Sequence, residues 1–115
     1  MRPLVLELSR ELIGGRVDKI TQQSRASLAM TIRRPGQTFL LQLSINPQNP
    51  AIYIANRVAE NLPEPPTFCM VLRKNLENGR IAAIRQLGLD RVIMIEIDTL
   101  GSGGIATFTL AVELV

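Results

Sequence analysis

An acidic and a basic residue stand side by side at Asp90-Arg91, two positions after Gly88 and directly before a β-branched stretch. At the mouth of a loop, such a pair can read a base edge and hold a phosphate together. Aspartate is also common in ordinary turns, so a plain turn is the alternative. We identify Asp90 and Arg91 as candidate nucleic-acid-binding residues.

A second basic group consists of Arg73 and Lys74, with Arg80 shortly after them. These side chains are suited to gripping phosphates. They are equally suited to a solvated helix face on which a basic residue pairs with Glu77. Eleven of the 13 basic residues are arginines, whose planar guanidinium favours phosphate contact, although an arginine-rich proteome explains the bias equally well. Both interpretations stay open.

Residue types argue against an active site. The chain has no histidine and one cysteine, which excludes histidine-based catalysis, Cys/His dyads and an intramolecular disulfide. Cys69 lies among apolar residues and is expected to be buried and inert. Glu96 and Asp98 are predicted to lie on a solvated strand face, and the glycines of residues 100–104 to form a hairpin turn. We expect no enzyme activity, no metal and no cofactor.

Size and composition indicate one folded domain. The 115 residues are 46% hydrophobic and 20% charged, and the formal net charge is +3. These values are typical of globular proteins and allow a polyanionic partner without requiring one. No signal peptide follows Met1-Arg2-Pro3, and no apolar run is long enough to span a membrane. We therefore expect a cytoplasmic protein.

The first half of the chain is predicted to form one helix and four strands. Residues 4–13 carry an apolar stripe, and Gly14-Gly15 ends the helix. The expected strands are 16–23, a hairpin of 27–34 with 38–45, and a short strand at the edge of the sheet, 51–55.

The second half is predicted to form one helix and three strands. Prolines precede a helix that begins near residue 67, packs its stripe of Phe68, Val71, Leu72 and Leu76, and ends at Asn78-Gly79. Extended segments follow at 80–87, 91–98 and 105–115, with Ile93, Ile95 and Ile97 facing the core. The fold class is α+β: an antiparallel β-sandwich or flattened barrel of about seven strands with two helices. We expect no internal repeat.

Three blocks agree in order and spacing with one family: ELIGGRVDKI at 11–20, EPPTFCMVLRKNLENGRI at 64–81 and QLGLDRVIMIEID at 86–98. The sequence resembles the NFACT N-terminal domain of the RqcH/NEMF family of ribosome-associated quality-control factors. The resemblance implies a module that binds tRNA, with alanine tRNA as the expected partner, and the large ribosomal subunit with peptidyl-tRNA. Such factors promote untemplated C-terminal alanine tailing of stalled chains, with ribosome docking mainly through other domains.

The resemblance also assigns functional residues and shows two departures from the family pattern. The family's Asp-Arg pair, needed for tRNA engagement, corresponds to Asp90 and Arg91, whereas Arg73, Lys74 and Arg80 are our own additions. Family members carry an acidic residue ahead of the first helix, which Met1-Arg2-Pro3 lacks. Relatives also continue past residue 115, so we expect a fragment of a longer multidomain protein, with 1–115 as its NFACT N-terminal domain.

Two further expectations come from the same resemblance. The fold is similar to the N-terminal domain of formamidopyrimidine-DNA glycosylases, but their N-terminal Pro-Glu is absent, so DNA repair does not transfer with the fold. Many bacterial members are called fibronectin-binding protein A, which makes a fibronectin-binding adhesin the alternative function. The four aromatic residues and the absence of a signal peptide argue against fibronectin as a partner.

Overall fold

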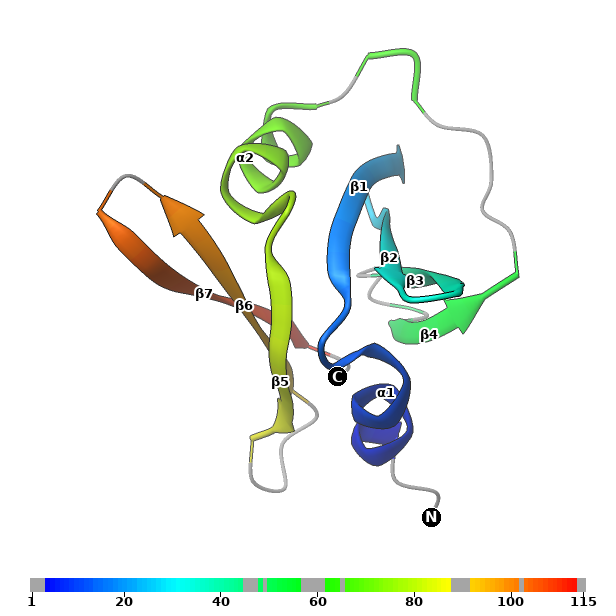
Figure 1. Ribbon diagram of the computed structural model, residues 1–115. Helices are drawn as coiled ribbons and strands as arrows, with labels where there is room; N and C mark the ends of the chain where they lie inside the picture. The colour runs from blue at the N-terminus through cyan, green and yellow to red at the C-terminus, as the bar shows by residue number, and fades with distance from the viewer. Residues whose placement is uncertain are drawn as a thin grey trace.

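The computed structural model describes residues 4–44, 48, 50–56, 62–64, 66–87, 92–101 and 103–113. Two helices and seven antiparallel strands make up these residues, which confirms the predicted α+β architecture (Figure 1). In chain order the elements are α1 (Leu4–Leu12), β1 (Arg16–Ser24), β2 (Ser27–Arg34), β3 (Gln37–Ser44), β4 (Ala51–Ala55), α2 (Thr67–Leu76), β5 (Arg80–Gln86), β6 (Val92–Gly101) and β7 (Gly104–Glu113).

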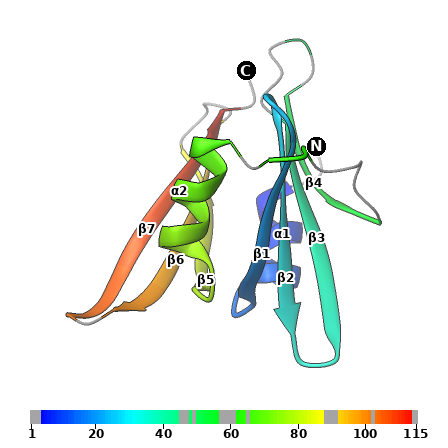
Figure 2. The same ribbon diagram turned by 90° about the horizontal axis from the view of Figure 1, so that it is seen from above.

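The strands form one sheet in the order β4-β3-β2-β1-β5-β6-β7, so the predicted place of 51–55 at an edge is confirmed. Within the described residues, β1 and β5 share a single pair in register, Arg16 with Arg80. Beyond this junction the sheet divides into two layers, with β1–β4 on one side and β5–β7 on the other (Figure 2). The similarity to the DNA glycosylase domain stays a prediction.

The core lies between the two layers and the helices. Leu8 and Leu12 of α1 are buried there, as are Ile93, Ile95 and Ile97 of β6, which confirms the predicted inward face of that strand. The alternation of buried and exposed residues along β6 follows from the two-residue period of a strand.

The packed face of α2 differs from the prediction. Cys69, Leu72 and Leu76 are buried, as expected for Cys69, but Phe68 and Val71 are 54% and 49% exposed. The reason is that α2 packs on only one side, mainly against β1 and β6, so the helix is rotated until its narrow stripe at Cys69, Leu72 and Leu76 meets the core. The outer half of the predicted stripe stays at the surface.

Two residues after the last residue of each helix, the chain passes through the left-handed backbone region, at Gly14 after α1 and at Asn78 after α2. Gly14 has φ of 88° and Asn78 has φ of 71°. Glycine enters this region at no steric cost, and asparagine is among the few other residues that tolerate it. The next residue in each case, Gly15 or Gly79, is buried, and the chain then enters β1 or β5.

The two halves of the sheet repeat one another in structure, although the sequence shows no internal repeat. Each half contains a helix, a glycine and three strands in a meander, to which β4 is added in the first half. The first strand of each half carries an irregularity at the same place. The registers correspond pair by pair: Arg16–Arg33 with Arg80–Asp98, Val17–Ile32 with Ile81–Ile97, Ile20–Met30 with Ile84–Ile95, and Gln22–Leu28 with Gln86–Ile93.

The hydrogen bonds at the junction repeat in the same way. The N–H of Gly14 donates to the carbonyl of Ile81 (2.8 Å), and the N–H of Asn78 donates to the carbonyl of Val17 (2.7 Å). The Ser9 hydroxyl of α1 reaches the carbonyl of Ile84, as an arginine of α2 reaches that of Ile20. The halves are thus related by an approximate twofold axis at the Arg16–Arg80 pair, and each helix packs on the first strand of the other half.

Candidate nucleic-acid interface

Arg73 joins α2 to β1 by bonding to the strand backbone. Its Nε donates to the carbonyl oxygen of Ile20 at 2.8 Å, and the N–H of Ile20 donates to Oε2 of Glu77 at 3.2 Å. Because β5 has already diverged from β1 here, these two side chains satisfy strand groups that would otherwise lack a ladder partner. Arg73 is half-buried, so it has a structural task whatever else it binds.

A shallow groove follows this contact between α2 and β1. Its lining is charged and polar, and it consists of Asp18, Lys19, Ile20, Thr21, Arg73 and Glu77. Lys74, the other predicted basic residue of α2, is exposed in the last turn of the helix. The groove therefore gathers two cations and two carboxylates, an arrangement suited to binding a polar partner.

Arg80 lies next to two arginines that the sequence analysis did not select. It pairs with Arg16 of β1, and Arg16 pairs on its other side with Arg33 of β2. Residues directly opposite each other in neighbouring strands lie on the same face of a sheet. We call Arg33, Arg16 and Arg80 the arginine row; all three are exposed.

A single carboxylate holds two members of the arginine row. Asp18 Oδ1 lies 3.1 Å from Nη2 of Arg16, and its Oδ2 lies 2.9 Å from Nε of Arg33. The hydrogen bond from Arg33 is the main cause that lowers the pKa of Asp18 below its ordinary value, and the charges of Arg33, Arg16 and Lys19 act in the same direction. Asp18 is thus ionised throughout the neutral range.

Arg80, the third member of the row, is bound by a residue of the first half of the repeat. Nη1 of Arg80 donates to the carbonyl of Gly14 at 3.1 Å, at the end of α1. Its neighbour on β6 is Asp98, whose Oδ1 accepts a 2.6 Å hydrogen bond from the hydroxyl of Thr107. Three guanidinium groups therefore lie beside two carboxylates, which leaves the row positive.

Asp90 and Arg91, the pair that the sequence analysis placed first, lie outside the described residues. The structure does bring Arg80 together with Arg16 and Arg33, whereas Arg73 lines the groove between α2 and β1. Sequence reasoning missed Arg16 and Arg33 because they are 17 residues apart in the chain and only the β1–β2 register joins them. The repeated Gly-Arg dipeptide at 15–16 and 79–80 was the available signal.

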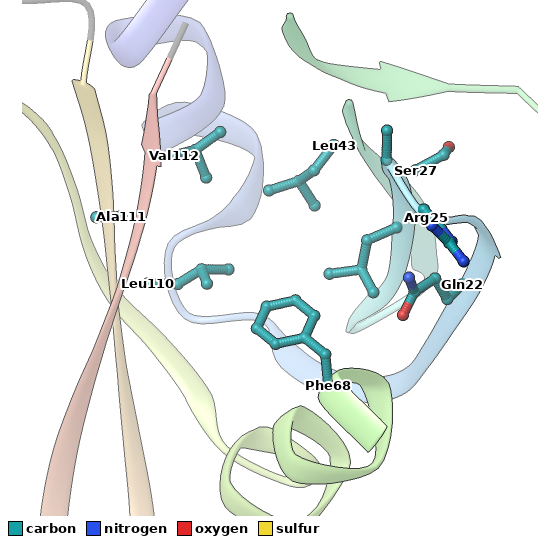
Figure 3. Close-up of a pocket in the computed structure, with 10 residues that line it drawn as sticks. Gln22, Arg25, Ser27, Leu43, Phe68, Leu110, Ala111 and Val112 are labelled. Carbon is teal, nitrogen blue, oxygen red and sulfur yellow. The ribbon is translucent and has the colours of Figure 1, made fainter. Parts of the chain in front are cut away.

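An apolar cavity of about 190 Å³ opens where the two layers separate. Figure 3 shows Phe68 of α2, Leu43 of β3 and Leu110 and Val112 of β7 pointing into it, whereas Ala111 points away. Arg25 is the charged residue in its lining. Such a cavity is suited to binding apolar side chains and carries no acid–base pair.

The predicted environments of Cys69 and Glu96 are confirmed. Cys69 is fully buried, with its Sγ 3.7 Å from the carbonyl of Ile20. Glu96 is part-exposed and pairs with Arg85 at 2.7 Å. Among the described residues, no group of three or more metal-binding side chains was found, and no helix has the length and apolarity that crossing a membrane requires.

The family is decided by a match over residues 1–115 to the family described as NFACT N-terminal and middle domains. The chain belongs to the NFACT N-terminal family. It is 41% identical over 91 residues to the Rqc2 homolog RqcH of Bacillus subtilis (strain 168) and 33% identical over 99 residues to the archaeal Rqc2 homolog aRqcH of Methanocaldococcus jannaschii. These matches cover 79% and 83% of this chain, but 16% and 15% of the relatives.

Two solved structures share the fold. The N-terminal domain of the fibronectin-binding protein PavA from Streptococcus pneumoniae superposes with a TM-score of 0.91 and 35% identity, covering 97% of this chain and 43% of that one. The N-terminal part of the fibronectin/fibrinogen-binding protein from Streptococcus suis has a TM-score of 0.91 and 32% identity, covering 97% and 42%. The NFACT family to which this chain belongs therefore includes ribosome quality-control homologues.

Proposed function

We propose that this NFACT N-terminal domain is the tRNA- and ribosome-binding module of a quality-control factor that promotes untemplated C-terminal alanine tailing of stalled nascent chains. The observation that carries the proposal is the family match over the whole chain, together with relatives named as Rqc2 homologues. The chain spans about one sixth of the length of those relatives. The proposal therefore concerns 1–115 as one domain of a longer multidomain protein in the cytoplasm.

In this proposal the domain binds RNA and performs no reaction of its own. Asp90 and Arg91 contact tRNA, with alanine tRNA as the partner, and Lys74 and Arg80 contribute phosphate contacts. Docking on a large subunit that still carries peptidyl-tRNA uses mainly other domains. Peptide-bond formation stays with the ribosome, in keeping with a chain that has no histidine for acid–base catalysis.

A domain exchange tests this function. The corresponding segment of the Bacillus subtilis relative is replaced by residues 4–113 of this chain, and the chimera is produced in cells that lack the native protein. We expect alanine tails on a stalled reporter, measured by mass spectrometry, and tRNA co-purifying with the chimera. Asp90→Ala with Arg91→Ala should abolish both, whereas the control Glu113→Ala should change neither.

Two outcomes of the domain exchange would contradict the proposal or part of it. A chimera that is produced at the level of the native protein and associates with large subunits, but adds no alanine and retains no tRNA, contradicts the proposed function. Tails of normal length in the Asp90→Ala/Arg91→Ala chimera contradict the role of that pair alone.

The second candidate is fibronectin binding, because the two solved relatives described above are named for fibronectin or fibrinogen binding. The apolar cavity beside Phe68 is the surface most suited to a protein partner. Surface plasmon resonance with immobilised fibronectin tests this candidate. Saturable binding that Phe68→Ala removes supports adhesion, and no response up to micromolar concentration rejects it for this domain.

A further inference from the structure

The arginine row is positioned by backbone pairing, which makes its spacing regular. Neighbouring strands lie about 5 Å apart, so three residues in successive strands form a line across the sheet rather than along one strand. The twofold repeat places Arg16 and Arg80 beside each other at its axis, and the β1–β2 register adds Arg33. Thr38 continues the line beyond Arg33, and Asp98 and Thr107 continue it beyond Arg80.

Each guanidinium group of the arginine row has more N–H donors than its described contacts use. An arginine carries five N–H groups in a planar fork. Among the described residues, Arg16 uses Nη2 and Arg33 uses Nε toward Asp18, and Arg80 uses Nη1 toward Gly14. The side chains of Arg16 and Arg33 are 44% and 51% exposed. The carboxylate and the carbonyl therefore orient the forks while other N–H groups remain on each arginine.

We propose that the arginine row binds consecutive phosphates of an RNA backbone that crosses β2, β1 and β5. Planar forks at regular spacing match a chain of phosphates, because each guanidinium can bind one phosphate with two parallel hydrogen bonds. The row does not include Asp90 or Arg91 and reads no bases, so it contributes affinity without sequence preference. This inference rests on the proposed RNA-binding function and names the residues that supply its electrostatic part.

The salt dependence of RNA binding gives the expected size of the effect. Each phosphate contact on a single strand changes log K by about 0.7 per unit of log salt concentration. Three contacts predict that affinity falls about twentyfold between 50 and 200 mM salt, and one contact predicts about threefold. Removing two members of the row should therefore weaken binding and flatten its salt dependence together.

The test measures binding of a fluorescein-labelled oligouridine to the 115-residue chain by anisotropy, across 50 to 200 mM KCl. The row variant is Arg16→Gln/Asp18→Asn/Arg33→Gln, which also removes the carboxylate so that no charge is left without its partner. It lowers the net charge by one. The control Arg25→Gln lowers the net charge equally, at an exposed position beyond the other end of β1.

We expect the control to bind like the unaltered chain and the row variant to bind at least about tenfold more weakly at 50 mM, with a salt slope reduced by about 1.4. Circular dichroism melting shows whether each variant folds. If the row variant does not fold, Arg80→Gln serves instead, because this exposed residue is one member of the row and should reduce the slope by about 0.7.

Three results overturn the inference: equal binding by row variant and control, no RNA binding by the unaltered chain, or displacement of RNA by polyglutamate as effective as by unlabelled RNA. The last would show a site for acidic chains in general. The tailing assay separates this failure from that of the proposed function. A chimera that makes alanine tails while the row variant binds RNA normally leaves the function standing and removes the row from it.

Discussion

Gly79→Ala tests how closely the residue before β5 approaches β6. A Cβ at this position would lie 2.6 Å from Cγ2 of Ile97 and 2.8 Å from Cγ2 of Thr99, both below any ordinary contact distance. It would also lie 3.0 Å from the carbonyl oxygen of Asp98. Because Ile97 is fully buried and the carbonyl belongs to the backbone, neither can move aside freely.

The expected cost follows from two opposing effects. Overpacking of a tight site costs about 1–3 kcal/mol, and replacing glycine by alanine restricts the unfolded chain, which returns about 0.4–1 kcal/mol. The free energy of unfolding should therefore fall by about 1–2 kcal/mol. For a domain of this size, that corresponds to a melting temperature lower by roughly 4–8 °C.

Urea denaturation followed by circular dichroism measures the change. Gly103→Ala is the matched control, because a Cβ there has no atom within 4 Å, and it should stay within about 0.5 kcal/mol of the unaltered chain. Thr99→Ser removes one of the two clashing methyl groups and keeps the hydroxyl that bonds to Ala106. Adding it to Gly79→Ala should recover part of the loss. Equal stability of Gly79→Ala and Gly103→Ala would refute the argument.

Three other changes test separate parts of the structure. Arg73→Met should lower the free energy of unfolding by about 1–2 kcal/mol, because the substitution leaves the carbonyl of Ile20 without this charged donor. In the same urea assay, Lys74→Met should change the free energy of unfolding by less than about 0.5 kcal/mol. The pKa of Asp18 is lowered in the folded state, so the stability that this carboxylate contributes is present above its unfolded pKa and is lost as pH falls through its folded pKa. Asp18→Asn should therefore flatten the decline in melting temperature below about pH 4. An unchanged decline would contradict the role of the hydrogen bond from Arg33. No strand of the described part of the chain pairs with the outer edge of β7, and Ile105 of this strand is 75% exposed. A lysine on an edge strand opposes pairing with another chain. Thr109→Lys should therefore delay aggregation on heating, measured by light scattering, relative to Thr109→Ser.

Much of the fold was predictable from the sequence because its signals are local. The stripe of 4–13, the alternation at Ile93, Ile95 and Ile97, and the helix ends at Gly14 and Asn78 each depend on a few neighbouring residues. Prediction was wrong where local periodicity leaves a choice. The apolar stripe of α2 allowed several rotations, and only packing against β1 and β6 decided that Phe68 stays exposed.

The internal repeat illustrates a second limit. Its halves share Gly-Arg at the start of the first strand and Ile and Gln further along it, but their second strands differ in nearly every residue. A register depends on which residues are buried and on turn geometry rather than on residue identity, so two segments with little sequence in common can pair in the same way. The repeat is therefore evident in strand pairs and hydrogen bonds.

For function, the sequence alone determined the family, through three blocks of residues, and with it the expectation of RNA binding. It also selected Arg80, although without its neighbours. Only the tertiary structure decided that Arg33, Arg16 and Arg80 form a row and that Asp18 orients two of them. The physical reason is that strand pairing joins residues far apart in the chain, and the electrostatic field of a surface depends on distances in space.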